Sequence, residues 1–348
     1  MNQGECCQTT VLVLEWLFTL DLFHNQDYTL NMRTLISGGT GFIGEHVVDL
    51  LIEEGHSVKI FSRRTVLPER LNGMGIEHVR GDFENPFSLI SALEGVDVFF
   101  HIGEIRSTSM AACLKNIALM QRILSSPVVK KIRRLVFVSS ITVAGIPGEV
   151  PATEDAALEI SLNDQYTFYK RTCERLLANN PSGAEYAIIR PAIAYGPRSV
   201  NLRKIAAILA KAGTIGLPFI GSGRSIAPFV HVKDLARAIY FAGVRPGAAG
   251  QTFNITDSLP HTWREFFDAI GGASGRRLII IPFPPLCFKV PAAFVDCLAS
   301  LCDLRLDLTK YITYFSRNLL FSRQKAKDIL GWEPFYTDFN RGIREMMA

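Results

Sequence analysis

Short apolar runs alternate with amphipathic stretches from residue 33 onward. The candidate strands are rich in aliphatic and β-branched residues and cover residues 34–37, 57–61, 97–101, 134–139 and 185–190. Between them, apolar positions recur at helical spacing over residues 43–54, 86–93, 111–124 and 166–178. Runs such as LVFV are apolar at every position, which suits strands that are covered on both faces. This rhythm predicts an α/β fold with a doubly wound, Rossmann-type parallel sheet.

The rhythm loosens after residue 197. Helical patterns cover residues 202–212, 233–242 and 262–270, and QTFNIT reads as one more strand. Thr262 and Glu265 have the spacing of a capping box. The four prolines at 282, 284, 285 and 291 exclude one continuous helix or strand over the remainder. We expect a smaller, mixed C-terminal substrate lobe at 199–227 and 257–348, and a dinucleotide-binding domain at 32–198 that also receives about 228–256.

The first 31 residues contain an apolar stretch, residues 11–23, that looks like part of a signal peptide. However, no Lys or Arg precedes it, Glu15 and Asp21 interrupt it, and no small-residue cleavage site follows. It is also shorter than the roughly 20 apolar residues that cross a bilayer. Because Met32 directly precedes RTLISGGTGFIG, where a nucleotide-binding domain would begin, we expect residues 1–31 to be an extension outside the fold.

Composition changes this picture little. Hydrophobic residues make up 48% of the chain, which is ample for a core, and 37 basic against 33 acidic residues give a net charge of only +4. Without a long run of like charges, a nucleic-acid-binding arm is not expected. The seven cysteines form no CxxC pair, and an odd number does not suggest a disulfide framework. We expect reduced thiols in a cytoplasmic protein and no metal site.

The segment SGGTGFIG places Gly38, Gly41 and Gly44 between a predicted strand and a predicted helix. Glycine suits such a place because the turn is tight, the backbone must approach a pyrophosphate, and the helix must pack closely on the sheet. The helix N-terminus then offers unpaired N–H groups to the phosphates. The segment predicts a dinucleotide-binding loop rather than a simple packing turn.

The end of the second strand bears on the choice of cofactor. An acidic residue there would bind the ribose hydroxyls of NAD, but this chain has Ser62, followed by Arg63 and Arg64. Guanidinium groups can take a 2′-phosphate in forked hydrogen bonds, so we expect NADP, with NAD still possible. The alternative is that the arginines only end the strand in solvent. Asp82 either accepts from the adenine amino group or is a simple turn residue.

A candidate catalytic set lies further along the chain. In YTFYK, Tyr166 and Lys170 are four residues apart at the start of a helix, which brings them onto one face. The ammonium group of the lysine lowers the pKa of the phenol and can bind the nicotinamide ribose. Ser140 ends the strand LVFVSS and can hydrogen-bond the same substrate oxygen. This set predicts proton transfer coupled to hydride transfer.

From about Met32 to the C-terminus, the chain resembles the extended short-chain dehydrogenase/reductases, the NAD-dependent epimerase/dehydratase family. The resemblance rests on GGTGFIG, VSSITVAG, YTFYK, RPAIAYGP, PFVHVKDLARA and KAKDILGWEP. It implies catalytic roles for Ser140, Tyr166, Lys170 and Asn116, the last supporting the lysine through water. It also implies cofactor contacts from residues near the strand ends: Gly38, Thr40, Gly41, Phe42, Ile43, Gly44, Ser62, Arg63, Arg64, Asp82, Phe83, Ile102, Gly103, Lys170, Pro191 and Ile193.

Departures from the family pattern narrow the expected reaction. Ile141 and Thr142 replace the Asp-Glu pair of the sugar dehydratases, and Ala227 and Pro228 replace an Arg-Asp pair of nucleotide-sugar enzymes. What remains is most similar to the dihydroflavonol reductase and 3β-hydroxysteroid dehydrogenase branch, which the segment LTK at 308–310 also resembles. Candidate substrate contacts are Glu104, which replaces a small residue, and three others: Thr142, Tyr195 and Arg198.

The sequence therefore predicts hydride transfer between NADP(H) and a secondary alcohol or ketone on a small, steroid-, terpenoid- or flavonoid-like substrate. Two alternatives stay open: a nucleotide-sugar epimerase with tightly bound NAD, and a non-catalytic dinucleotide sensor. The apolar stretch LIIIPFPPLCFKVPAAFVDCLASLCDL either packs as core and lid or forms an apolar substrate mouth or a peripheral membrane contact without a spanning helix. The family resemblance implies a homodimer.

Overall fold

The computed structural model describes residues 31–105, 109–156, 158, 164–180, 183–212, 216–275, 277–301 and 308–347. The predicted N-terminal extension therefore lies, apart from Asn31, outside the described residues.

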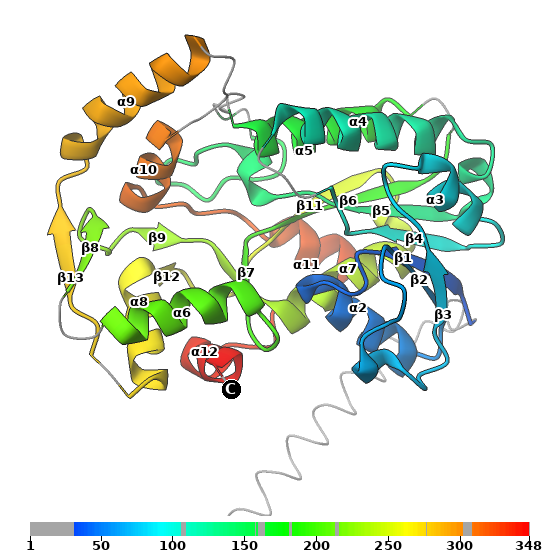
Figure 1. Cartoon of the computed structure of the whole chain (residues 1–348), viewed down its shortest axis with the longest axis horizontal. Coiled ribbons are helices and arrows are strands. Elements are labelled where there is room, and N and C mark those ends of the chain that lie inside the picture. Colours follow the sequence, from blue (N-terminus) through cyan, green and yellow to red (C-terminus); the bar gives the residue numbers. More distant parts are fainter. Residues whose placement is uncertain are drawn as a thin grey trace, which may run out of the picture. The chain divides into compact units, whose positions relative to one another are not determined.

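A seven-stranded sheet forms the centre of the fold, in the order β11-β6-β5-β4-β1-β2-β3. All neighbouring strands in it run parallel. This confirms the predicted doubly wound α/β class (Figure 1). The strands are β1 Arg33–Ser37, β2 Ser57–Ser62, β3 Glu77–Arg80, β4 Val98–His101, β5 Arg134–Val138, β6 Tyr186–Pro191 and β11 Gln251–Ile255.

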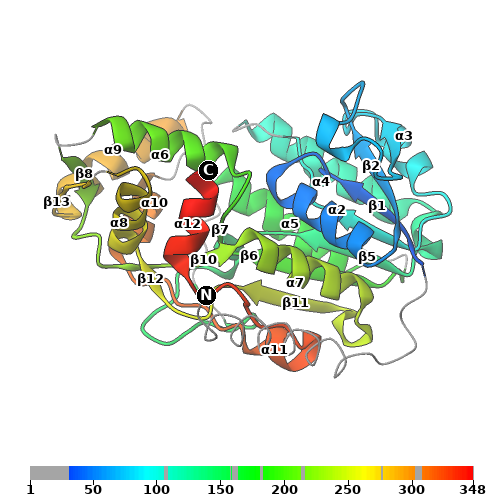
Figure 2. The same ribbon diagram turned by 90° about the horizontal axis from the view of Figure 1, so that it is seen from below.

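Helices cover both faces of this sheet, as Figure 2 shows. One layer contains α2 Phe42–Glu53, α7 Val232–Val244 and α11 Gln324–Leu330; the other contains α3 Pro86–Ala92, α4 Met110–Ser125 and α5 Gln165–Ala178. Side chains alternate across a strand, so Ile36 of β1 packs in the first layer and its neighbour Leu35 in the second. Such double burial explains why the strands read as continuous apolar runs.

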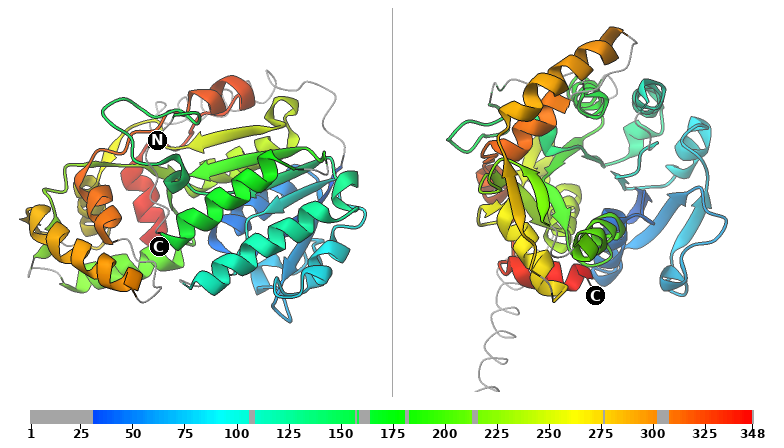
Figure 3. Two further views of the ribbon diagram at one scale, coloured as in Figure 1. Left: turned by 90° about the horizontal axis from the view of Figure 1, so that it is seen from above. Right: turned by 60° about the vertical axis from the view of Figure 1, so that its left-hand side comes forward.

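The C-terminal part is built from three small two-stranded sheets and short helices (Figure 3). The pairs join β7 Ile193–Tyr195 to β10 Phe229–His231, β8 Leu217–Ile220 to β13 Ile280–Phe283, and β9 Ile226–Ala227 to β12 His261–Thr262. The α-helices are α6 Val200–Ala212, α8 Trp263–Ala273, α9 Leu286–Leu301, α10 Leu308–Ser316 and α12 Phe339–Met347. Short 3-10 turns lie at η1 Glu69–Leu71, η2 Val129–Lys131, η3 Ile141–Ala144 and η5 Pro246–Ala248.

Two local predictions for this part can be compared with the structure. The capping box is confirmed: the Thr262 hydroxyl accepts from the Glu265 N–H, and the Glu265 carboxylate accepts from the Thr262 N–H at 2.6 Å. The proline-rich segment divides into β13 and α9, as its prolines require. Pro291, however, lies inside α9 rather than at a boundary, and the helix tolerates the loss of one backbone hydrogen bond there.

Within the described ranges, none of the helices combines the length and the apolar character needed to pass through a bilayer.

Candidate active site

The carboxyl ends of β1 and β4 lie side by side at the point where the strand order reverses. Gly38 follows β1 with a positive φ of 80°, and a Cβ atom on it would lie 2.6 Å from the backbone nitrogen of Gly103, after β4. A Cβ on Gly44 would overlap the carbonyl oxygen of Gly38. Only glycine allows these backbones to approach so closely. Open α/β sheets bind their ligands at such a switch point.

The first turn of α2 begins soon after the end of β1. Gly41, its N-cap, donates its N–H to the carbonyl of Gly38 at 2.9 Å, and Gly41 contributes no side-chain cap. The N–H groups of Phe42, Ile43 and Gly44 therefore stand at a helix N-terminus, which favours anionic groups. Together with Thr40, these residues fit the pyrophosphate of a dinucleotide.

The end of β2 provides the predicted 2′-phosphate residues. Arg63 and Arg64 are exposed, while Ser62 is buried and its hydroxyl hydrogen-bonds His78 at 3.0 Å. Asp82 accepts from the N–H of Glu84 at 3.1 Å, as a turn aspartate does. The ring of Phe83 stacks on that of Phe61 and meets His101 edge-on. Ile102 and Gly103 follow β4 directly, so these predicted contacts gather at one edge of the sheet.

The predicted catalytic side chains meet next to the segment that follows β4. Ser140 follows β5 and caps η3, and Tyr166 and Lys170 lie in the first two turns of α5. Ser140 lies close enough to the Tyr166 hydroxyl to lower its pKa. The ammonium group of Lys170 is 5.6 Å from the centre of the Tyr166 ring and donates to the carbonyl of Val138 at 2.9 Å. Lys170 is only 3% exposed, whereas Tyr166 is 40% exposed and so accessible to a substrate.

The electrostatics of Tyr166 are balanced between opposing neighbours. Loss of water around the hydroxyl raises its pKa, and this outweighs the lowering by Lys170 and by Ser140. The carboxylate of Glu104 adds to the increase. The expected lowering by the lysine is therefore present but is not the dominant effect in the protein alone.

Glu104, whose role the sequence left open, forms an ion pair with Lys170 at 3.1 Å. Burial by itself lowers the pKa of Lys170, but the neighbouring tyrosines and Glu104 reverse the direction and raise it, so the lysine stays charged. Asn116 holds the backbone next to Glu104: its amide donates to the carbonyls of Ile105 and Ala112, both at 3.0 Å, and accepts from the N–H of Ile105. Asn116 thus fixes the segment that carries Glu104.

The remaining predicted residues lie in three settings. Thr142 is beside Ser140 and donates to its hydroxyl at 3.1 Å. Pro191 is buried at the end of β6, and Ile193 begins β7. Tyr195 is fully buried and packs edge-on against Phe229, His231 and Phe339. These contacts are those of a core residue.

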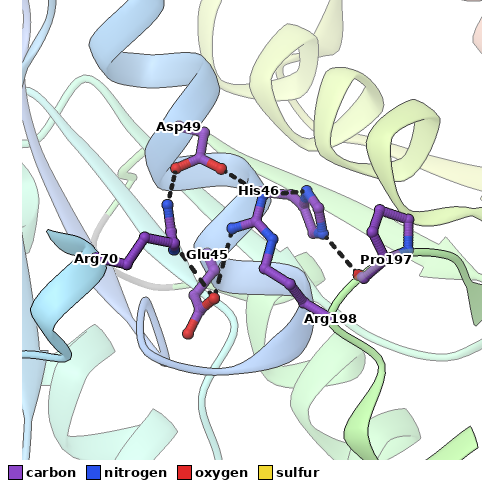
Figure 4. A network of polar contacts seen from close by, with 6 residues as sticks. All are labelled: Glu45, His46, Asp49, Arg70, Pro197 and Arg198. Carbon is purple, nitrogen blue, oxygen red and sulfur yellow. Dashed lines mark hydrogen bonds and ion pairs between the residues drawn. The ribbon is translucent and has the colours of Figure 1, made fainter. Parts of the chain in front are cut away.

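Arg198 contacts helix α2. Its guanidinium pairs with Asp49 at 2.6 Å and with Glu45 at 3.5 Å, as Figure 4 shows. Arg70 binds the same two carboxylates from η1. The charge of Arg198 is therefore engaged by α2 in this structure.

Three residues near Ser140 were not predicted as site residues. Asp164 caps α5, Thr167 is completely buried, and Lys310 of α10 donates to both, at 2.8 and 2.7 Å respectively. Asp164 carries a recognisable sequence signal, since it precedes the helix as an N-cap residue. Lys310 is far away in the sequence, and no local pattern indicates where its side chain lies.

Comparison with known protein families decides the assignment. The model of the NAD-dependent epimerase/dehydratase family matches residues 34–256, which include the glycine loop, Ser140, Tyr166 and Lys170. The chain belongs to this family. This confirms the family that the sequence motifs predicted.

Relatives within the NAD-dependent epimerase/dehydratase family carry the names of dehydrogenases and reductases. A 3beta-hydroxysteroid-dehydrogenase/decarboxylase of Arabidopsis thaliana is 27% identical over 89% of this chain, which spans 60% of that relative's length. A 2-alkyl-3-oxoalkanoate reductase of Stenotrophomonas maltophilia is 28% identical over 70% of this chain and 76% of its own. The UDP-glucose 4-epimerase of Thermus thermophilus in complex with NAD shares the fold, with a TM-score of 0.66 and 22% identity over 91% of this chain and 98% of its own.

Proposed function

We propose that this protein transfers a hydride between NADP(H) and a secondary alcohol or ketone on a small, apolar molecule. The observation that carries the proposal is the meeting of Ser140, Tyr166 and Lys170 next to the segment that follows β4. Family members named as hydroxysteroid dehydrogenases and oxoalkanoate reductases support the same chemistry.

Each catalytic side chain has a separate task in this proposal. When bound, NADP(H) supplies or takes up the hydride. Tyr166 gives its proton to the carbonyl oxygen in reduction and takes it back in oxidation. Ser140 hydrogen-bonds the same oxygen and holds it next to Tyr166. Lys170 binds the nicotinamide ribose and stabilises the phenolate through its positive charge.

The cofactor would lie along the edge formed by the ends of β1, β2 and β4. Gly38, Gly41 and the start of α2 would hold the pyrophosphate. Arg63 and Arg64 are exposed where the 2′-phosphate of NADP would lie, and this supports NADP over NAD. Ile102, Gly103, Pro191 and Ile193 would line the nicotinamide half.

Two features support an apolar substrate of steroid, terpenoid or flavonoid type. The position of a sugar-nucleotide arginine is taken by Ala227, which is 2% exposed in β9. Apolar side chains are exposed along β13 and α9, among them Phe283, Leu286 and Val290. We also propose that the protein forms a homodimer, is located in the cytoplasm and makes peripheral contact with a membrane. The proposal includes the division into a cofactor lobe and a substrate lobe. Among the described cysteines, Cys113, Cys173 and Cys287 are free thiols.

A panel of steroid, terpenoid and flavonoid ketones, followed by NADPH absorbance beside a panel of nucleotide sugars, tests the substrate class. Tyr166→Phe keeps the ring but removes the proton, so reduction should fall by about a hundredfold while NADPH still binds. Tyr169→Phe is the matched control: Tyr169 is also on α5 and contacts Lys170, but it is 3% exposed and away from Ser140. Turnover of nucleotide sugars with retained NAD, or full reduction by Tyr166→Phe, would overturn the proposal.

A further inference from the structure

A chain of hydroxyl groups leads from Ser140 towards the C-terminal part of the molecule. The Ser140 oxygen accepts from the backbone N–H of Thr142 at 3.3 Å and from its hydroxyl at 3.1 Å. The hydroxyl of Thr167 lies 3.1 Å from that of Thr142. A serine oxygen has two lone pairs and one proton, and Thr142 occupies both lone pairs. The proton of Ser140 is therefore free to point towards Tyr166 and the substrate oxygen.

Lys310 stands at the other end of this chain. Its ammonium group donates to the hydroxyl of Thr167 at 2.7 Å and to the carboxylate of Asp164 at 2.8 Å. The side chains of Lys310 and Asp164 are 4% and 13% exposed, so water weakens this pair little. The contact joins α10 to the first turn of α5, which also carries Tyr166.

The charge of Lys310 affects where the Thr142 proton points. The Thr167 proton is held by the Asp164 carboxylate at 2.5 Å, because a charged acceptor makes the stronger hydrogen bond. The Thr142 proton has two oxygens within reach, those of Thr167 and Ser140, both at 3.1 Å. The ammonium group of Lys310 occupies a lone pair of Thr167 and repels a second proton from that oxygen. The Thr142 proton therefore goes to Ser140.

We propose that Lys310 is a positioning residue that orients the hydroxyl chain Thr167–Thr142–Ser140 and so directs the proton of Ser140 to the substrate oxygen. This rests on the proposed function, because it assigns Ser140 to the oxygen that Tyr166 protonates. It also makes the C-terminal part of the molecule a contributor to the reaction through a side chain that touches neither substrate nor cofactor.

Kinetics of Lys310→Met test the proposal on any ketone that the unmodified protein reduces. The loss of a correctly oriented hydrogen bond at Ser140 should lower kcat by about threefold to tenfold, with little change in KM for NADPH. Lys310→Arg keeps the charge and should restore part of kcat. Lys327→Met, which removes an exposed ion pair with Glu333 from α11, should leave kcat unchanged.

A double-mutant cycle separates orientation from a general structural effect. Thr142→Val breaks the link between Lys310 and Ser140, so Lys310→Met should cost nothing further in that background. Multiplying effects would show that Lys310 acts independently of the chain and would overturn the proposal. If Lys310→Met does not fold, Thr167→Val with Thr142→Val gives the same cycle while leaving the Lys310–Asp164 ion pair in place.

A second readout needs no turnover. Ultraviolet titration of the Tyr166 phenolate, taken as the difference from Tyr166→Phe, should show a higher midpoint in Lys310→Met. The increase should be smaller when Lys310→Met is added to Thr142→Val, where only the direct effect of the Asp164 carboxylate remains. An unchanged midpoint in Lys310→Met would contradict the proposal. Loss of activity in Tyr166→Phe with full activity in Lys310→Met would reject the role of Lys310 alone and leave the proposed function standing.

Discussion

The ion pair between Glu104 and Lys170 places a carboxylate next to the group that tunes Tyr166. Four groups face the phenol: Lys170 and Ser140 lower its pKa, and Glu104 and Asp164 raise it. Glu104 therefore opposes the lysine and favours the protonated phenol. A protonated phenol is the form that donates in reduction, so Glu104 should bias the protein towards ketone reduction at neutral pH.

Glu104→Gln tests this bias. Oxidation of an alcohol needs the deprotonated Tyr166, so its rate rises with pH through the pKa of the phenol. Without the carboxylate this pKa falls, the rise moves to lower pH, and oxidation at neutral pH increases by roughly threefold to tenfold. Glu84→Gln, which removes an exposed partner of Lys115, is the control. A shift of the pH profile to higher pH would contradict the assignment of Glu104.

Some of the residues of the candidate site could be predicted from the sequence and others could not. Ser140, Tyr166 and Lys170 were predictable because spacing on one helix and a strand end fix where they meet. The partner of Glu104 was not, since the approach of the segment after β4 to α5 depends on tertiary packing. Lys310 was harder still, because its contact with Thr167 joins elements that are distant in the chain.

In the proposed function, the choice of cofactor depends on the end of β2. In Arg63→Ala, NADP should bind roughly tenfold more weakly while NAD is unaffected, since one charge-assisted contact to a 2′-phosphate is worth about 1 to 2 kcal/mol. Titration of each cofactor, followed by protein fluorescence, measures the ratio of the two dissociation constants. Arg122→Ala removes an exposed arginine from α4 and should change neither affinity. Equal or tighter binding of NAD by the unmodified protein would reject the NADP preference.

Elements were predictable where hydrophobic periodicity was strong. The five strands expected before residue 197 correspond to β1, β2, β4, β5 and β6, because burial on both faces leaves a continuous apolar signal. The pair β9–β12 was not predictable, since each strand has two residues and shows no alternation. Its pairing depends on the tertiary packing around it.

At the scale of the whole molecule, Arg198 connects helix α2 to the segment that leads into the C-terminal part. It lies between β7 and α6, and among the described residues it is the non-glycine residue with positive φ, 67°. A backbone in this region costs about 1 kcal/mol or more, and the surrounding contacts must hold it. The ion pairs with Asp49 and Glu45 provide them (Figure 4). The sequence indicated the arginine but not its partners, which lie on an element of the other half of the fold.

Arg198→Ala should therefore destabilise the whole protein, by about 1 to 2 kcal/mol in the free energy of unfolding at pH 7. Burial raises the pKa of Asp49, but Arg198 and Arg70 outweigh it, so the pKa lies below 3.8 and this stabilisation is lost as the pH falls through it. Burial and Arg198 lower the pKa of His46 from 6.5 to about 4. The unmodified protein therefore also loses stability as the pH falls from 6.5 to about 4. The variant loses less in this range, because Arg198 no longer opposes protonation of His46. The difference in the free energy of unfolding between the two proteins should then shrink between pH 7 and pH 3, as measured by urea unfolding.

Arg341→Ala, which breaks an exposed pair with Glu345, should have almost no effect at either pH. A difference that stays constant across this range would show that Arg198 stabilises the fold by packing rather than by its charge.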